Sequence, residues 1–213
     1  LEMVGIGAFH QAARRQVEVL NRRSRQAADM GQFQEARDFA TRSWQLADRW
    51  SAEAGAAEAQ KTLGIVHGSM GEYEQAAQSF STALATYQTL RDPQGESACL
   101  ISLGLIHLYR GNLDEALRFY HQALGIVQDL ADRRKEGRLL DNMGVAYRLG
   151  GDYGQARLYG EQARAIFQEI GDWPALSINL ESIGATSMAQ GDLDAALSFY
   201  QSALELARRF QDP

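Results

Sequence analysis

Two histidines, His67 and His107, are the first residues to consider for metal binding, and they stand 40 residues apart. A zinc site needs three or four histidine, cysteine or carboxylate ligands gathered at one point. One histidine per helix, with no cysteine or carboxylate partner, does not meet that need. Both histidines are therefore expected to pack or to form hydrogen bonds, and no metal ligand is predicted.

The acidic residues Asp141 and Glu181 are the best candidates for acid–base chemistry, because residues 40 apart would approach each other on stacked helices. In a binding groove, however, such a pair more often receives basic side chains of a ligand. The basic run from Arg133 to Lys135 is balanced by nearby acids and is interpreted as a solvated helix start. No P-loop, nucleophile elbow or dinucleotide-binding glycine pattern occurs. The sequence therefore predicts no enzyme, no catalytic residue and no cofactor.

The elements that carry these residues repeat every 40 residues. We call residues at the same position of successive copies a column. One column is made of glycine alone: Gly31, Gly71, Gly111, Gly151 and Gly191. Further columns of small residues lie seven residues before it and five and twelve residues after it. A fixed period of this length indicates a repeat array, and columns of small residues indicate close packing of backbones.

Each copy divides into two helical segments without the alternation typical of strands. In the third copy, residues 96–110 and 113–130 both show apolar residues at helical spacing. The glycine column falls where a helix ends in the left-handed conformation. Predicted N-caps follow the turns: Asn112, Asp152 and Asp192 within copies, and Asp92, Asp132, Asp172 and Asp212 between them. The prediction is ten antiparallel helices stacked as five hairpins.

The composition limits the class of protein. Hydrophobic residues make up 45% and charged residues 23% of the chain, which is enough for a continuous core and too little charge for disorder. A net charge of −6 argues against nucleic-acid binding, and no apolar run is long enough for membrane insertion. The single cysteine, Cys99, indicates a core position and a reducing, cytoplasmic compartment. The Ala-, Arg- and Gln-rich surface favours a bacterial origin.

The pattern of the second copy resembles the tetratricopeptide repeat signature: Leu63, Gly64, Gly71, Tyr73, Ala76, Phe80 and Ala83. The third copy repeats it, and the resemblance covers about residues 15–211. Two copies depart from the signature. Arg23 and Ser24 replace its usual Leu-Gly in the first copy, and Gly160 replaces its large aromatic residue in the fourth, where Tyr159 is expected to fill part of the gap.

The period is longer than the family's usual one of about 34 residues. It resembles a subgroup that includes spindle-orientation adaptors and bacterial regulators such as quorum-peptide receptors and signalling ATPases. The resemblance implies a right-handed superhelical solenoid whose first helices line a concave groove for a peptide or a partner helix. The predicted repeats are residues 13–51, 52–91, 92–131, 132–171 and 172–213. Residues 1–12 are an extension, either a tag remnant or the start of the first helix.

Columns that vary between copies are free to bind a partner, and on the first helices they share one face. The centre of this face is apolar and its rim is charged, which suits an amphipathic helix or an extended peptide. The alternative is that the solenoid itself or a terminal helix buries the apolar residues. The candidate groove residues are Arg22, Arg25, Lys61, Ile65, Ile101, Leu105, Leu108, Arg138, Asp141, Asn142, Val145, Arg148 and Glu181.

Three functions remain open. The first is an adaptor that binds a protein or peptide in the groove. The second is a ligand-sensing segment of a larger bacterial regulator, either an ATPase, a transcription activator or a protease. The third is a scaffold that self-associates through its N-terminal segment or its last helix. On that helix Leu197, Tyr200, Leu204, Ala207 and Phe210 form an open face, which indicates either a piece of a longer protein or a surface for another chain.

Overall fold

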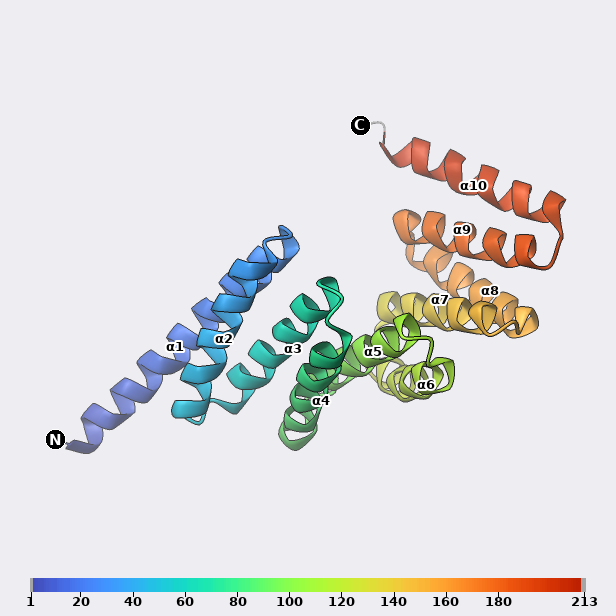
Figure 1. Cartoon of the computed structure of the whole chain (residues 1–213). Coiled ribbons are helices and arrows are strands. Elements are labelled where there is room, and N and C mark those ends of the chain that lie inside the picture. The colour runs from blue at the N-terminus through green and yellow to red at the C-terminus, as the bar shows by residue number, and fades with distance from the viewer. Residues whose placement is uncertain (1, 212–213) are drawn as a thin grey trace. The chain divides into compact units, whose positions relative to one another are not determined.

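The computed structural model describes the backbone of residues 2–211 and the side chains of residues 9–209. Within these residues the chain forms ten α-helices and no strand (Figure 1). The helices are α1 (Glu2–Asp29), α2 (Phe33–Arg49), α3 (Glu53–Ser69), α4 (Tyr73–Leu90), α5 (Pro93–Tyr109), α6 (Leu113–Asp129), α7 (Arg133–Leu149), α8 (Tyr153–Ile170), α9 (Trp173–Ala189) and α10 (Leu193–Gln211). The predicted all-α repeat fold is confirmed.

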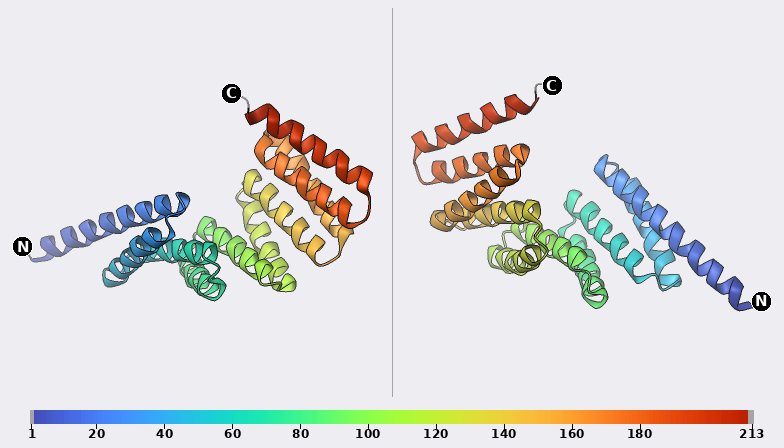
Figure 2. Two further views of the ribbon diagram at one scale, coloured as in Figure 1. Left: turned by 45° about the horizontal axis from the view of Figure 1, so that its top comes forward. Right: turned by 180° about the vertical axis from the view of Figure 1, so that it is seen from behind.

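The helices pack as hairpins in two compact units, Leu1–Ile106 and His107–Pro213, whose boundary falls inside α5. In the first unit α1 packs on α2 and α3 on α4, and in the second α7 packs on α8 and α9 on α10 (Figure 2). Contacts also join each hairpin to the next within a unit, from α2 to α3 and from α8 to α9. The backbone of residues 2–12 is continuous with the rest of α1.

The turn between the two helices of each copy depends on its glycine. All five glycines of the repeat column have a positive φ, from 73° at Gly31 to 83° at Gly191. This left-handed conformation is costly for residues with a Cβ atom. The predicted role of the column is confirmed, because the turn ends one helix and immediately begins the next.

The turns between copies reach the same conformation mostly without glycine. Ser51, Arg91 and Ala131 have φ of 50°, 55° and 52°, and only the fourth position of this column, Gly171, is a glycine. In each case the next N–H donates to a carbonyl five residues earlier, as in the 2.8 Å bond from Ala52 to Ala47. These helix-ending hydrogen bonds offset the backbone strain. This second left-handed column was not predicted, because its residue types carry no local signal.

Most of the predicted caps are confirmed. The carboxylates of Asp152 and Asp192 accept from backbone N–H groups of α8 and α10 at 3.0 Å, and Asp92, Asp132 and Asp172 cap the helices between copies. The prediction for Asn112 is wrong, since its side chain accepts no capping bond. Asp212 lies outside the described residues.

Candidate functional site

The candidate groove residues fall on the first helices of both units, so they form two surfaces. The N-terminal strip comprises Arg22, Arg25, Lys61, Ile65, Ile101 and Leu105 on α1, α3 and α5. The C-terminal strip comprises Leu108, Arg138, Asp141, Asn142, Val145, Arg148 and Glu181 on α5, α7 and α9. Helical periodicity explains the grouping, because residues three, four and seven apart share a face of a helix.

A carboxylate organises the polar part of the N-terminal strip. Glu58 accepts from Lys61 Nζ at 2.7 Å and from the Tyr87 hydroxyl at 2.9 Å, and Arg25 Nε lies 3.6 Å from its other oxygen. Burial, followed by the charge of Glu58, raises the pKa of Tyr87, so this hydroxyl stays a donor. The charge of Lys61 is thus already balanced by Glu58, and Arg25 is the more accessible cation of the two.

The apolar part of the N-terminal strip is accessible to solvent. Ile65 is 42% exposed, while Ile101 and Leu105 are half-buried. Arg22 is exposed on α1. An isoleucine so accessible on a packed helix is available for contact with a partner.

One column of the predicted groove lies partly at the contact between successive first helices. Asn21 is buried and donates from Nδ2 to the Gly55 carbonyl at 2.9 Å, which joins α1 to α3. Asp141, in the same column, contacts α9. Variation in this column therefore reflects how neighbouring repeats join as well as any partner.

Asp141 is the centre of a polar network in the C-terminal strip. Asn179 Nδ2 donates to Asp141 Oδ1 at 2.7 Å and to the Gly160 carbonyl at 3.1 Å, and the Ser182 hydroxyl lies 3.5 Å from Asp141 Oδ2. Burial raises the pKa of Asp141, while the two hydrogen bonds and the charge of Arg148 oppose that rise. The predicted approach of Asp141 to Glu181 is replaced by this network. Asn179 was not predicted, because only the fold seats its amide between two helices.

Glu181 lies elsewhere on α9. It is exposed and lines a depression of about 290 Å³ between α9 and α10, together with Trp173, Pro174 and Ile178. Apolar side chains make up most of this lining. Glu181 is thus placed to meet a charged or polar group at the edge of an apolar surface.

Gly160 leaves a space that the next helix fills. A Cβ atom at this position would lie 2.9 Å from Ile183 Cγ1, which belongs to α9. The expectation that Tyr159 fills the gap is wrong. Its ring stacks instead on Tyr147 of α7, with centroids 5.3 Å apart and planes 6° from parallel. The reason is direction, because adjacent residues on a helix point about 100° apart.

The remaining residues of the C-terminal strip present a mixed surface. Arg138 is exposed, Asn142 and Val145 are half-buried, and Leu108 is half-buried on α5. Arg148 is half-buried, and its Nε atom is buried without a hydrogen-bond partner among the described residues. Because Val145 carries no charge, a substitution there tests contact with a partner without removing a buried charged group from α7.

The histidines take structural roles. His67 Nδ1 is hydrogen-bonded to Glu72, which also lies 3.8 Å from Arg37, so the expectation of no carboxylate partner is wrong for this residue. His107 packs against Phe119, and burial lowers its pKa. Among the described residues no three metal-binding side chains gather at one point. Cys99 is fully buried, and burial raises its pKa to about 12, which keeps the thiol protonated and unreactive.

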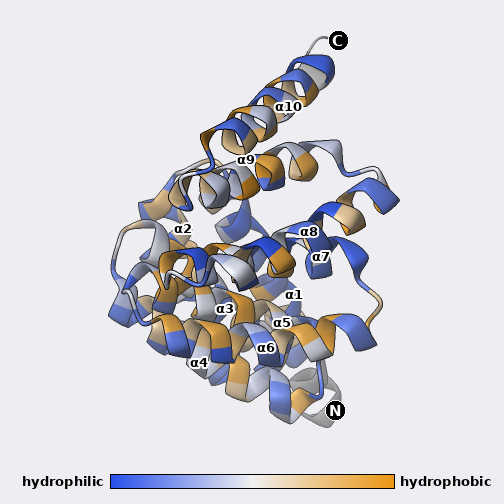
Figure 3. Cartoon of the chain, turned by 90° about the vertical axis from the view of Figure 1, so that its right-hand side faces the viewer, coloured by the Kyte–Doolittle hydropathy of each residue, from blue (hydrophilic) through white to orange (hydrophobic). Residues whose placement is uncertain are grey.

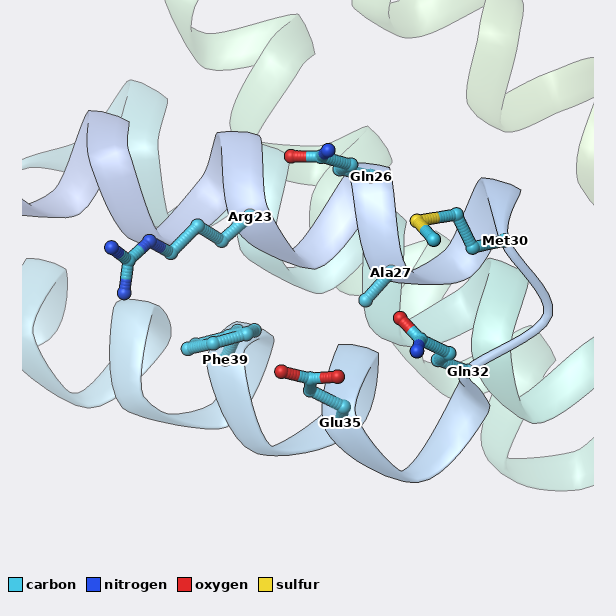
Figure 4. Close-up of a pocket in the computed structure, with 7 residues that line it drawn as sticks. All are labelled: Arg23, Gln26, Ala27, Met30, Gln32, Glu35 and Phe39. Atoms are coloured by element: carbon cyan, nitrogen blue, oxygen red, sulfur yellow. The ribbon is translucent and has the colours of Figure 1, made fainter.

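A second depression lies at the end of the first hairpin, between α1 and α2. It measures about 260 Å³, and Figure 4 shows Arg23, Ala27 and Met30 on one side and Glu35 and Phe39 on the other. The guanidinium of Arg23 lies 5.8 Å from the Phe39 ring centroid. This edge of α1 is polar where the later copies are apolar, since Arg23 stands in the column of Leu63, Leu103, Met143 and Ile183.

The repeat pattern matches known family models. Residues 96–169 and 180–213 each match a model described as tetratricopeptide repeat, and together the two matches span about half of the chain. The chain belongs to the tetratricopeptide repeat family. Tetratricopeptide repeats are generally protein-interaction folds without enzymatic activity.

Solved tetratricopeptide-like structures share the fold. BtubC (BKLC) from P. vanneervenii has a TM-score of 0.79 at 19% identity, covering 98% of this chain and 93% of that one. The Rap protein complexed with Competence and Sporulation Factor has a TM-score of 0.80 at 19% identity, covering 92% and 55%. The STAND protein PH0952 from Pyrococcus horikoshii, with a tetratricopeptide repeat sensor, has a TM-score of 0.80 at 16% identity, covering 92% and 31%. No curated protein sequence matches the chain.

Proposed function

We propose that this chain is a protein-interaction scaffold whose first helices bind a peptide or an amphipathic helix of a partner protein. The observation that carries the proposal is the column of Arg25, Ile65, Leu105, Val145 and Ala185. It is aliphatic from the second copy onward, yet Ile65 is 42% exposed and the next three residues are half-buried. By contrast, the adjacent column of Val66, Ile106, Ala146 and Thr186 is buried in all four of these copies.

The difference between these two columns favours a binding role for the accessible one. Burial of aliphatic side chains is favourable. A ligand can bury the half-exposed column further, whereas the column that is already buried has little apolar surface left to lose. An accessible cation flanks it in each unit, Arg25 in the first and Arg138 in the second. A ligand with apolar residues on one face and acidic residues beside them would fit both strips.

Two structural relatives support a peptide as the ligand. Both are Rap proteins in complexes, one with Competence and Sporulation Factor and one with the Phr* peptide. We infer that this chain uses its repeats in the same general way. The buried free thiol of Cys99 supports a reducing cytoplasm as its location, and the composition of the surface supports a bacterial one. No helix of the described residues is long and apolar enough to cross a membrane.

The second candidate is a sensor segment of a larger regulator. It is supported by the STAND protein with a tetratricopeptide repeat sensor, of which the chain covers 31%. In a sensor, ligand binding would change the packing between repeats and so act on an attached domain. This alternative uses the same strips and predicts the same ligand chemistry.

The test is to select a ligand from a random peptide library on the immobilised chain and to measure its affinity by calorimetry. Ile65→Glu in the first unit and Val145→Glu in the second are the test variants. A buried charge in an apolar contact is unfavourable, so we expect at least one of them to weaken binding by about tenfold or more, equal to about 1.4 kcal/mol.

The matched controls are Ala85→Glu on α4 and Ala165→Glu on α8, which place the same charge at exposed positions of second helices. Neither should change the affinity, and circular dichroism should show unchanged helicity in all four variants. Equal affinity of the wild type and both test variants for every selected peptide would remove the two strips as the binding surface.

A further inference from the structure

The outer face of α10 carries a row of exposed leucines. Leu193, Leu197 and Leu204 are 68%, 57% and 50% exposed, and half-buried Tyr200 lies between them. Their spacing of four, three and four residues places all of them on one side of the helix. Figure 3 shows apolar and polar residues alternating along α10, as this spacing requires. We call these four residues the α10 stripe.

The corresponding residues of earlier copies are less exposed or less apolar. On α6, Leu117 and Leu124 occupy the columns of Leu197 and Leu204 and are half-buried. On α8 the same two columns hold Arg157 and Arg164. Of the helices α6, α8 and α10, it is therefore α10 whose residues in these columns are both apolar and exposed. Burial of this stripe by a partner would be favourable.

The outer edge of α1 is a poorer partner for the stripe, because polar residues lie between its exposed Val19 and Met30. On the outer edge of α1, Arg23 and Gln26 are exposed in columns that are apolar and buried in the second, third and fourth copies. Stacking α1 of one copy on α10 of another would place both polar side chains against leucines and remove them from water, which is costly. The chemistry of the two ends thus disfavours a head-to-tail contact.

A second α10 fits the stripe well. Asp194 in the first turn and Arg208 in the last lie on the same flank of the stripe, because residues 14 apart are separated by about 40° around a helix. In an antiparallel pair that places Leu197 opposite Leu204 of the second copy, Asp194 comes beside Arg208 of the second copy. Two symmetric ion pairs then close the apolar contact.

We propose that two copies of this chain associate through the α10 stripe as an antiparallel pair, with the two-fold axis beside Tyr200 and Gln201. A two-fold contact of this kind is isologous, uses the same surface of both copies and closes after two. The stripe contains none of the candidate groove residues, so the inference is independent of the peptide-binding function.

Sedimentation velocity over a range of concentrations tests the association, with Leu197→Glu as the disrupting variant. We expect the wild type to form a dimer and Leu197→Glu to raise the dimer dissociation constant by about tenfold or more. Leu158→Glu on α8, where the leucine is 49% exposed, is the matched control and should dimerise as the wild type does.

The ion pairs give a test that misfolding cannot imitate. Asp194→Arg and Arg208→Asp should each weaken the dimer, and the double variant should restore it. An oxidised Gln201→Cys variant should form a disulfide across the two-fold axis, while Gln162→Cys on α8 should not. A wild type that stays monomeric at millimolar concentration, or a double variant weaker than both single ones, would overturn the proposal. If the wild type is monomeric by itself but binds a leucine-bearing helical peptide through the stripe, the partner is a different protein and the proposed dimer is wrong.

Discussion

The hairpins α3–α4 and α7–α8 both carry a glycine seven residues before the turn, Gly64 and Gly144. The space beside this glycine is filled differently in the two hairpins. In the first, Gly64 faces the buried ring of Phe80, and a Cβ atom on the glycine would lie 2.8 Å from it. In the second, Gly160 replaces the ring, and a Cβ atom on Gly144 would lie 3.1 Å from the Ala156 carbonyl oxygen. The helices α7 and α8 therefore meet backbone against backbone.

The consequence of the missing ring appears in the next helix. Ile183 of α9 enters the space above Gly160, and Asn179 binds both the Gly160 carbonyl and Asp141. A larger side chain at position 160 would press on Ile183, since even a Cβ atom would lie 2.9 Å from it. In α7–α8 the space beside Gly160 is thus filled from the next hairpin, and a polar network that includes the Gly160 carbonyl lies beside the proposed binding surface.

The largest expected effect follows from removing the ring on which α3–α4 depends. Phe80→Ala should lower the free energy of unfolding by about 3–5 kcal/mol, because it leaves a cavity against Gly64 that backbone movement cannot close fully. Urea unfolding followed by circular dichroism measures this loss. Phe119→Ala, where the ring is half-buried, is the control and should cost clearly less. Equal costs would show that the ring column is not the main packing element of the hairpin.

A smaller effect is expected where the ring is absent. Asn179→Ala removes the amide donor to both Asp141 and Gly160, so it should lower the free energy of unfolding by about 1–3 kcal/mol. Asn142→Ala on α7, outside the network, should cost about 0.5 kcal/mol or less. If the two variants unfold at the same denaturant concentration, the network does not hold α9 to the hairpin.

The smallest effect should depend on pH. The pKa of Asp141 is raised in the folded chain by burial, so its contribution to stability is present below the ordinary aspartate pKa of about 3.9 and is lost as the pH rises through the folded value. Asp141→Asn, which carries no charge, should therefore melt at a higher temperature than the wild type at neutral pH. The difference should shrink toward pH 3.5. A constant difference across this range would show that burial of the Asp141 charge is not its cause.

Local features of the chain were readable from sequence because they depend on few residues. Gly191 marks a turn because it alone of its neighbours takes a positive φ freely, and Asp192 caps α10 because its carboxylate reaches the third N–H of the helix. The left-handed turns at Ser51, Arg91 and Ala131 were missed, since nothing in those residue types requires this conformation. At each of them the next N–H donates to a carbonyl five residues earlier and ends the helix.

The candidate surface shows the same division. The period and the varying columns placed Ile65 and Val145 on one face of the first helices, while the structure showed how far each is exposed. The role of Asp141 and the seat of Asn179 were not predictable, because they depend on which side chain of α9 reaches α7 and α8.

By itself the sequence determined the all-α repeat, the glycine turn within every copy, most helix caps and the family. These features are set by contacts within about one helical turn, repeated at a constant period. Only the tertiary structure decided that Ile183 and not Tyr159 occupies the space above Gly160, that Asp141 binds Asn179 and not Glu181, and that α10 carries exposed leucines. Those outcomes depend on residues far apart in the chain, which meet through the packing of successive helices.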